Sequence, residues 1–384
     1  MSDLVTRRGV LGLGVAAAAA SAVTKAQVAD RPVGFAVVGL GKLSLGQIIP
    51  GFRNCKNARL AALVSGHLEK ANRVAAEQKL RPAAVYSYED FERIAADPRI
   101  EVVYIVLPNF MHREYTERAF KAGKHVLCEK PMATTVEDAE AMVAAAKSAN
   151  RKLMIAYRCQ YEPLNLYGMR LMGRGALGKP RLVVTNMGRQ ADLSDPSDAW
   201  RLDMRESGGG ALADMGIYGI NGSRYLLNEE PVEVRARAQT NREDPRFRTV
   251  EDLITWEFRF PSGAVSTNCT SFNQAATMAW EVYGEKGKMI AEPGCFYGGN
   301  RLSLNGVPGE DQPKIREIDQ FAREMDWMAA VVRGRSPLVS PGEEGLQDMR
   351  LIRAILESVK RDGAPVRTDW GYRRAIDPAV AVRV

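Results

Sequence analysis

The clearest pattern of apolar positions begins with the run Val33–Val38, which is followed by the glycine-containing segment GLGKLSLG. Apolar residues then recur with helical spacing, for example at Ile48 and Phe52. This order of buried strand, glycine-rich turn and helix predicts the start of a dinucleotide-binding fold. Two further apolar runs, 101–108 and 124–131, are separated by a helical segment. Such alternation is typical of a parallel sheet.

The second half of the chain follows a different pattern. Few helices interrupt its β-rich stretches before a last predicted helix at 345–360, which could pack on either domain. The sequence therefore predicts an α/β protein, with a Rossmann domain over 33–153 and a second, β-rich domain over 154–384. The β-rich stretches, separated by turn residues, are 181–188, 231–241, 252–265 and 278–292.

The N-terminal segment has the anatomy of an export signal. Arg7 and Arg8 precede an apolar run rich in Gly and Ala, and Lys25 lies near the expected cleavage point. The paired arginines indicate a twin-arginine (Tat) signal, with an ordinary secretory signal or a disordered N-terminus as the alternatives. We therefore predict a signal peptide over 1–26, a short arm over 27–32 and a periplasmic location. The apolar run is shorter than the roughly 20 residues that span a bilayer, so no membrane anchor is expected.

Composition narrows the classes of partner. The 384 residues are 46% hydrophobic and 26% charged, which is typical of a soluble protein with a full core. The formal net charge of +7 is spread without a basic block, so no nucleic-acid partner is expected. The five cysteines are widely spaced and form no C-x-x-C pair, so we expect neither a disulfide framework nor a metal site.

The glycine-rich turn contains residues suited to hold cofactor phosphates. Gly39 would permit the tight turn and Gly41 would let the backbone approach a pyrophosphate, although Ser44 stands where the fingerprint has Gly or Ala. The next strand ends at Ser65, where an NAD-binding site would carry an acidic residue. Lys70 follows and would attract a 2′-phosphate, so the pattern predicts NADP; the alternative for Lys70 is a solvated helix residue.

Further candidates follow strand ends or share a helix face. In open α/β sheets, ligands bind at the carboxyl ends of the strands, where this sequence places Asn109, Glu129 and Lys130. On residue type alone, Lys130 is one candidate acid or hydrogen-bond donor among several. Asp214 and Tyr218 are four residues apart, so a helix would place them on one face.

Several motifs together resemble one protein family over nearly the whole mature chain. The segments GLGKLS, LPNFMH, CEKPMATT and WRLDMRESGGGALADMGIYGIN are similar to those of the Gfo/Idh/MocA oxidoreductases, and MIAYRCQYEP, SPGEEGLQD and TDWGYRR resemble the glucose-fructose oxidoreductases within it. The resemblance implies a Rossmann domain followed by an α+β domain with a large, mostly antiparallel open sheet. One face of that sheet would make subunit contacts, giving a homo-oligomer, either a dimer or a tetramer.

The resemblance also implies roles for individual residues. Many family members have His where this chain has Tyr218, so Tyr218 becomes the candidate for proton transfer. Lys130 would polarise the sugar oxygen and favour the phenolate, while Asp214 would orient a sugar hydroxyl or hold Lys130. The candidate catalytic residues are thus Lys130, Tyr218 and Asp214. The candidate cofactor-binding residues are Gly39, Gly41, Lys42, Leu43, Ser65, Lys70, Asn109, His112, Glu129, Lys130, Arg158, Trp200 and Arg201.

Besides Lys70, three of these candidates have a purely structural alternative. Arg158 would equally pair with a carboxylate between the domains, and Trp200, which could stack on a sugar, would serve as packing. His112 would equally be a hydrogen-bonded loop residue.

The implied activity is hydride transfer between sugars. An aldose would be oxidised at C1 to the aldonolactone, and a second sugar, fructose or another aldose, would be reduced to an alditol by the same tightly bound NADP(H). A Tat substrate folds before export, so it could load its cofactor in the cytoplasm. The resembling enzymes carry a long Pro-rich arm, where this chain has only 27–32. The alternatives are an NADP-dependent aldose dehydrogenase with an exchangeable cofactor and a non-catalytic sugar or nucleotide sensor.

Overall fold

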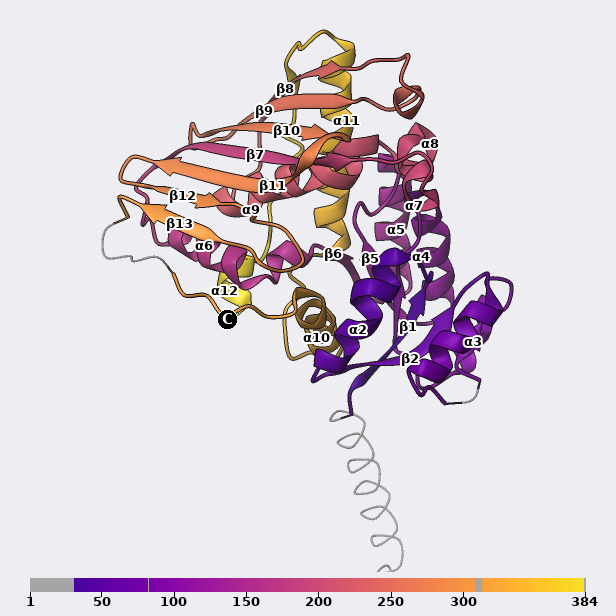
Figure 1. Ribbon diagram of the computed structural model, residues 1–384. Coiled ribbons are helices and arrows are strands. Elements are labelled where there is room, and N and C mark those ends of the chain that lie inside the picture. Colours follow the sequence, from indigo (N-terminus) through magenta and orange to yellow (C-terminus); the bar gives the residue numbers. More distant parts are fainter. Residues whose placement is uncertain (1–30, 82, 308–312, 383–384) are drawn as a thin grey trace, which may run out of the picture.

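The protein is built on two β-sheets that lie in different parts of the molecule, one in each half of the chain (Figure 1). The computed structural model describes residues 31–81, 83–307 and 313–382. The predicted signal peptide and residues 27–30 of the predicted arm lie outside these ranges. Among the described residues, no helix combines the length and apolar content needed to cross a bilayer.

Sheet A is the predicted parallel sheet. Its six strands pair in the order β3-β2-β1-β4-β5-β6, all parallel. Every residue of β1 and β4 is buried, as expected for a parallel sheet covered on both faces. The strands are β1 (Val33–Val38), β2 (Ala58–Val64), β3 (Val85–Tyr86), β4 (Val102–Ile105), β5 (His125–Glu129) and β6 (Leu153–Ala156).

Helices and turns connect these strands. The longer helices are α3 (Leu68–Glu77), α4 (His112–Lys121) and α5 (Val136–Ser148). The segment after the glycine-rich turn is irregular, with a π-helical turn (Ser44–Ile48), α2 (Ile49–Gly51) and a 3₁₀ turn (Phe52–Asn54). Further 3₁₀ turns cover Phe91–Ala96, Asn109–Met111 and Arg158–Gln160. The last strand of sheet A, β6, ends at Ala156, three residues beyond the predicted end of the Rossmann domain at residue 153.

Sheet B is the predicted large sheet of the second half. Its eight strands pair in the order β13-β12-β11-β7-β10-β9-β8-β14, and all pairs are antiparallel except β7 with β10. Figure 1 shows helices behind this sheet and none in front of it. The strands are β7 (Pro180–Gln190), β8 (Glu233–Gln239), β9 (Leu253–Arg259), β10 (Val265–Ser271), β11 (Asn273–Gly284), β12 (Lys288–Ala291), β13 (Leu302–Asn305) and β14 (Val366–Arg367).

The helices of the second half cover sheet B and join it to sheet A. Helix α9 packs on β7 and β10, and α10 packs against β2 of the Rossmann domain. Helix α11 contacts both α5 and β8, so the last long helix joins the two domains instead of packing on one. The helices are α6 (Pro163–Gly173), α7 (Pro196–Ala199), α8 (Met204–Ser207), α9 (Ile217–Leu227), α10 (Gln320–Val332), α11 (Gly342–Lys360) and α12 (Pro378–Ala381), with 3₁₀ turns at Trp200–Leu202 and Pro245–Phe247.

A buried ion cluster fixes α9 against α11. The side chain of Arg224 on α9 is fully buried and pairs with Glu230, Glu344 and Asp348. Removing one partner of such a buried group leaves an uncompensated charge, which is strongly destabilising. The cluster therefore holds in place the helix that carries Tyr218.

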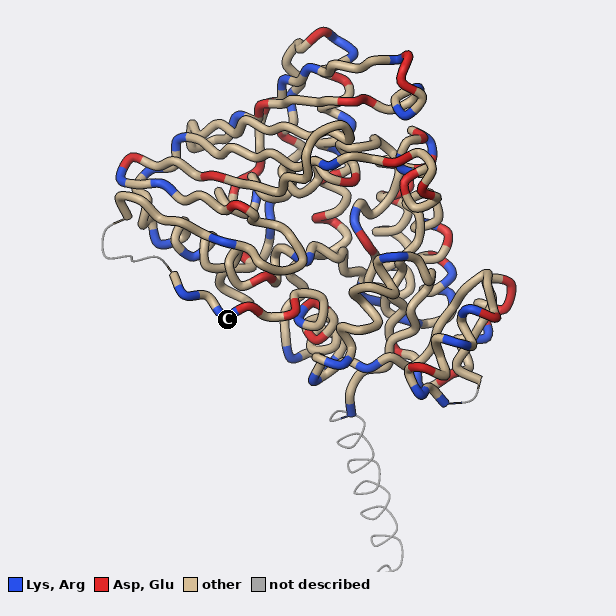
Figure 2. Tube along the Cα trace, in the orientation of Figure 1, with Lys and Arg blue, Asp and Glu red and all other residues tan. Residues whose placement is uncertain are grey.

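Charge is distributed over the whole chain. In Figure 2, Lys and Arg are interspersed with Asp and Glu along both domains, and neither positive nor negative charge predominates at one end of the molecule in this view.

Candidate active site

Lys130 and Asp214 meet where the two domains join. Lys130 follows β5 at the carboxyl edge of sheet A, and Asp214 lies in a π-helical turn (Leu212–Gly216) that leads into α9. The Lys130 Nζ donates to the backbone oxygen of Asp214 at 2.8 Å and lies 3.4 Å from its Oδ1. The two candidates are thus brought together, and Asp214 holds the ammonium group by two different oxygens.

Asp214 is surrounded by cations. Its Oδ2 accepts from Arg201 Nε at 3.0 Å and lies 3.5 Å from Arg189 Nη2. Burial alone would raise the pKa of this carboxyl, but Arg201, Lys130 and Arg189 together hold its pKa well below the usual range. Asp214 is therefore an anchor that stays ionised, and it is no candidate for a general acid.

Tyr218 lies in the first turn of α9, and the Lys130 ammonium group lies over the face of its ring. Asp214 and Tyr218 were expected on one regular helix; instead a π-helical turn precedes α9, a feature common at functional sites. Helix α9 lies very close to sheet B: a Cβ atom at Gly219 would stand only 2.4 Å from Thr185 Oγ1. Glycine at this position therefore lets the helix seat against the sheet, which determines where Tyr218 lies.

The cation that bonds to the Tyr218 oxygen is not the expected one. Lys130 Nζ lies 4.7 Å from the centre of the Tyr218 ring, over its face, whereas Arg158 Nε donates to the phenol oxygen at 3.1 Å. Arg158 thus joins the site through Tyr218, and among the described residues it forms no ion pair with an interdomain carboxylate. Burial raises the pKa of Tyr218 well above its usual value, and Arg158 opposes that rise.

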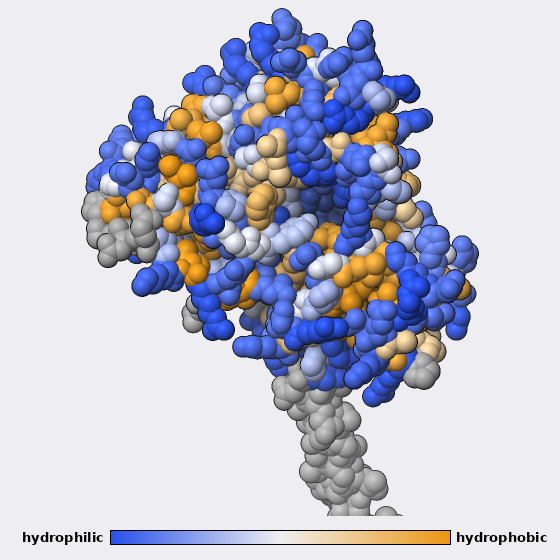
Figure 3. Space-filling view, viewed as in Figure 1, coloured by the Kyte–Doolittle hydropathy of each residue, from blue (hydrophilic) through white to orange (hydrophobic). Residues whose placement is uncertain are grey.

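A small pocket lies beside these groups. Lys130, Cys159 and Tyr218 line it, together with Tyr157, Ile217, Asn221 and Tyr225. Figure 3 shows that the molecular surface is hollowed between the part built on sheet B and the part built on sheet A.

The glycine-rich turn has the geometry of a phosphate-binding loop. Gly39 has a φ of 93°, and a Cβ there would stand 2.3 Å from the Val106 oxygen, so no other residue fits. A Cβ at Gly41 would meet nothing within 4 Å, which leaves open space above the turn. Ser44, the departure from the fingerprint, is buried and donates to the Gly39 oxygen at 2.6 Å. The Ser44 hydroxyl thus stabilises the turn.

The residues expected to select NADP lie next to this turn. Lys70 Nζ donates to the Leu40 oxygen at 2.7 Å, so its ammonium group is held against the glycine-rich turn instead of lying free in solvent. Ser65 is buried, and its Oγ accepts from the backbone nitrogen of His67 at 3.1 Å. The hydroxyl that follows β2 and the cation on α3 thus lie beside the glycine-rich turn, and these residues fit NADP.

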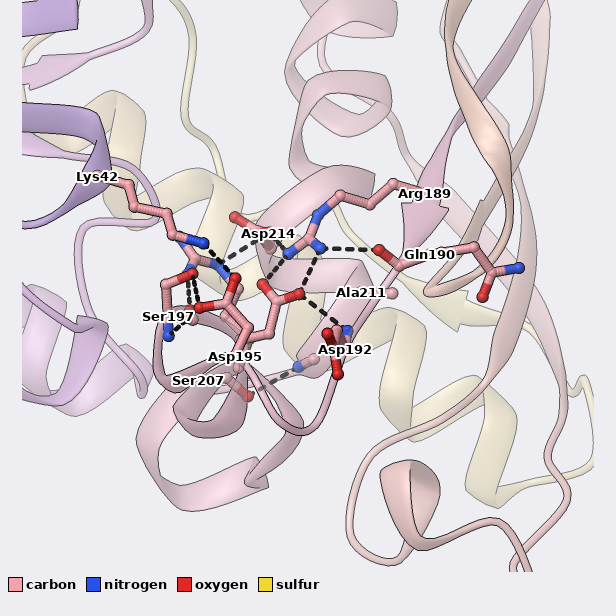
Figure 4. A network of polar contacts seen from close by, with 12 residues as sticks. Lys42, Arg189, Gln190, Asp192, Asp195, Ser197, Ser207, Ala211 and Asp214 are labelled. Carbon is pink, nitrogen blue, oxygen red and sulfur yellow. Dashed lines mark hydrogen bonds and ion pairs between the residues drawn. The ribbon is translucent and has the colours of Figure 1, made fainter. Parts of the chain in front are cut away.

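Lys42 makes a contact that the sequence did not indicate. Its Nζ forms an ion pair with Asp195, which lies on the loop between β7 and α7, so the glycine-rich turn is joined directly to the second domain (Figure 4). Asp195 Oδ1 also accepts from the backbone nitrogen of Ser197 at 2.9 Å. Leu43, next in the turn, is half-buried against the core.

Two other candidates, Asn109 and His112, have structural partners. Asn109 donates to the Ser207 oxygen at 2.7 Å, which links the β4 loop to the second domain. His112 is fully buried with its ring nitrogens 2.9 Å from the oxygens of Leu107 and Pro131, and burial lowers its pKa to about 4. His112 is therefore hydrogen-bonded within the protein, as in the structural alternative, but it is the first residue of α4 and not a loop residue.

Glu129 and Trp200 also have partners within the protein. Glu129 is buried, accepts from the Tyr104 hydroxyl at 2.8 Å, and has its pKa raised by burial. Trp200 stacks under Arg201, whose guanidinium carbon is 4.3 Å from the ring centre, so the indole packs on the arginine that holds Asp214.

Sequence reasoning missed Arg189 and Asp195. Arg189 lies near the end of β7 and pairs with both Asp198, at 2.6 Å, and Asp214 (Figure 4). Nothing in the local sequence separates it from the many exposed arginines, because its role depends on where β7 ends. Among the described residues, no group of His, Cys, Asp and Glu side chains is arranged to hold a metal ion.

Comparisons with known proteins agree with this architecture. Residues 33–157 match the model of an oxidoreductase family with an NAD-binding Rossmann fold, and residues 169–290 match the GFO/IDH/MocA C-terminal domain. The chain is 34% identical to a D-xylose 1-dehydrogenase [NADP(+)] of Haloarcula marismortui over 88% of this chain and 94% of that protein. It is 27% identical to a 1,5-anhydro-D-fructose reductase of Ensifer adhaerens over 71% and 81%.

A solved structure is also similar. The crystal structure of an aldose-aldose oxidoreductase from Caulobacter crescentus, complexed with glycerol, has 41% sequence identity and a TM-score of 0.83, and the match covers 88% of this chain and 100% of that one. The two family models match the two domains in order, and the similar structure covers both domains. The chain belongs to the Gfo/Idh/MocA oxidoreductase family, as its motifs predicted.

Proposed function

We propose that this protein is an exported sugar oxidoreductase that oxidises an aldose at C1 to the aldonolactone and reduces a second sugar to an alditol through NADP(H) that stays bound. The observation that carries the proposal is the meeting of Lys130, Asp214 and Tyr218 at the carboxyl edge of sheet A. The similar aldose-aldose oxidoreductase, at 41% identity, supports the choice of two sugars as substrates.

The chain's own residues would divide the work as follows. Bound NADP would supply the hydride acceptor and donor, and the turn at Gly39 and Gly41 would hold its pyrophosphate. Lys130, held by Asp214, would donate a hydrogen bond to the sugar oxygen at the reacting carbon. Tyr218 would take the proton from the C1 hydroxyl in oxidation and return it in reduction. In each half-reaction the proton and the hydride leave or enter the same C–O group.

Export supports retention of the cofactor. A folded Tat substrate would carry its NADP out of the cytoplasm and would find no pool to exchange with outside. Turnover there requires that a second sugar reoxidise the bound nucleotide. The contacts that could help retain the cofactor include the ion pair between Lys42 and Asp195, which connects the glycine-rich turn to the second domain.

The experiment that tests the proposal is to pass the mature protein through a desalting column, denature it and identify the released nucleotide by mass spectrometry. About one NADP(H) per chain, converted to the reduced form by prior glucose, is the expected result. Adding fructose or a second aldose should then restore the oxidised form. A protein that emerges without nucleotide contradicts retention.

The second candidate is an NADP-dependent aldose dehydrogenase that exchanges its cofactor. The 34% identity to a D-xylose 1-dehydrogenase [NADP(+)] favours it. Free NADP+ would then support steady turnover of one aldose alone, with NADPH released into solution. The retained-cofactor enzyme would instead stop after one turnover until an acceptor sugar is added.

A further inference from the structure

Arg158 is a buried cation placed inside the site. It lies in the 3₁₀ turn after β6, and 4% of its surface is exposed. Among the described residues no carboxylate forms an ion pair with it. Its Nη1 donates to Gln320 Oε1 at 2.7 Å and its Nη2 to the Cys295 oxygen at 2.6 Å. These neutral acceptors fix the guanidinium but leave its charge without a direct counter-ion.

Aromatic rings complete its surroundings. The guanidinium carbon lies 4.8 Å from the ring centres of Tyr218 and Tyr297. Rings present a negative face to a cation, so the two tyrosines stabilise the buried charge. A cation kept buried at such desolvation cost without a carboxylate partner is well placed to act on the Tyr218 oxygen, which accepts from its Nε.

The hydrogen-bond chemistry fixes the direction of the phenol proton. Arg158 Nε donates to the Tyr218 oxygen at 3.1 Å, and an arginine has no acceptor atom, so the phenol cannot donate back to it. Lys130, on the ring face, likewise has no acceptor. No acceptor for the Tyr218 hydroxyl is found in the described part of the chain. Its proton is therefore left for an oxygen of a bound ligand.

We propose that Arg158 is a positioning residue for proton transfer: it holds the Tyr218 oxygen as an acceptor, directs the phenol proton to the sugar oxygen and stabilises the phenolate. In reduction, the phenol O–H bond breaks and the proton passes to the sugar carbonyl oxygen as its carbon gains the hydride. The electron pair of that bond stays on the phenol oxygen beside Arg158. Oxidation runs in reverse. This inference rests on the proposed role of Tyr218.

The other groups around Tyr218 cannot replace Arg158 in this role. Glu129, Cys159 and Asp214 all raise the pKa of the phenol, as burial does to a greater extent, while Arg158 lowers it. Lys130 lies over the ring, and its ammonium group is held by Asp214. The titratable or charged groups that face Tyr218 are Arg158 and Cys159 after β6, Glu129 and Lys130 at the end of β5, Asp214 before α9, and Tyr297.

The first test needs no nucleotide. A polyfluorinated tyrosine, whose phenol is more acidic than that of tyrosine, is placed at position 218 and titrated by ¹⁹F NMR in nucleotide-free protein, with Arg158 and with Arg158→Gln. Loss of a neighbouring cation should raise the pKa of the fluorinated phenol by about one unit or more, a tenfold change in its acidity. An unchanged pKa overturns the proposal. If Arg158→Gln does not fold, Arg158→Met replaces it, with a rise of the same sign expected because this change also removes the cation.

The second test measures hydride transfer. Single-turnover reduction of bound nucleotide is followed by absorbance against pH for Arg158→Lys, Tyr218→Phe and the double variant. The Arg158→Lys profile should shift to higher pH, and the same change should alter the Tyr218→Phe rate by less than about twofold. Equal losses in both backgrounds would show that Arg158 acts only on the fold.

The matched control is Arg170→Lys, which alters an arginine bonded to the oxygens of Ala379 and Val382 away from the site, and its pH profile should stay unchanged. A Tyr218→Phe variant with full activity would refute the role of Tyr218 itself. Impaired Tyr218→Phe with a normal Arg158→Lys profile would refute only the role of Arg158.

Discussion

Replacing Asp214 with asparagine tests the charge balance of the site. The substitution keeps the shape and the backbone oxygen, which accepts from Lys130 Nζ at 2.8 Å, but removes the negative charge that faces Lys130, Arg201 and Arg189. The shortest lost contact is that of Arg201 Nε, at 3.0 Å. The other two, at 3.4 and 3.5 Å, act mainly through charge.

The expected magnitude follows from these contacts and their exposure. A hydrogen bond to a charged group contributes about 1.5–3 kcal/mol, and breaking a fully buried ion pair costs about 3–5 kcal/mol. The side chains of Arg201 and Arg189 are 25% and 26% exposed, and Arg189 keeps Asp198. Solvent can therefore compensate part of the loss. We expect Asp214→Asn to lower the free energy of unfolding by about 2–3 kcal/mol at pH 7.

The pH dependence gives the sharper result. Because the folded-state pKa of Asp214 lies below its ordinary value of 3.8, its stabilisation is fully present above that value. It is lost as the pH falls through the folded-state pKa. The difference in unfolding free energy between wild type and Asp214→Asn should thus be constant from about pH 8 to pH 5 and shrink below about pH 4.

Urea unfolding at a series of pH values measures both quantities, and single-turnover hydride transfer measures the effect on the site. Because Lys130 keeps its bond to the backbone oxygen, we expect a loss of hydride-transfer rate of about 10- to 100-fold instead of abolition. Asp192→Asn is the matched control, since it removes a carboxylate from an exposed position in the neighbouring loop. A stability difference under about 0.5 kcal/mol at pH 7, or one that does not shrink in acid, would refute the reasoning.

Three other substitutions have defined outcomes. Gly39→Ala would place a methyl group 2.3 Å from a backbone oxygen, so calorimetric NADP titration should detect no binding to folded protein; normal affinity would contradict the turn geometry. Lys70→Ala should raise the Kd for NADP about tenfold more than that for NAD, and equal changes would remove Lys70 from cofactor selection. Arg224→Met should lower the free energy of unfolding by about 3–5 kcal/mol through the uncompensated Glu230 and Asp348, since Glu344 keeps Arg374, as urea denaturation would show; a stable variant would mean that these carboxyls are readily neutralised.

The sequence by itself determined the order of the elements and the family. Continuous apolar runs such as Val33–Val38 are readable as buried parallel strands because a sheet covered on both faces has no polar side. Gly39 was readable as a turn residue because its neighbours in sequence form the strand and the helix that the turn joins. The local pattern thus predicts the order of the elements, and the motifs shared over nearly the whole mature chain identify the family.

Only the tertiary structure decided which charged groups meet. Lys130 and Asp214 are 84 positions apart, and Lys42 and Asp195 are 153 apart, so no local pattern links the partners. The sequence led us to expect Lys130 as the cation that tunes Tyr218, yet Arg158 bonds to the phenol oxygen, because β6 and α9 bring them together. Periodicity specifies which face of an element is buried, whereas the pairing of polar groups depends on how those faces dock, and docking is settled by contacts between residues far apart in the chain.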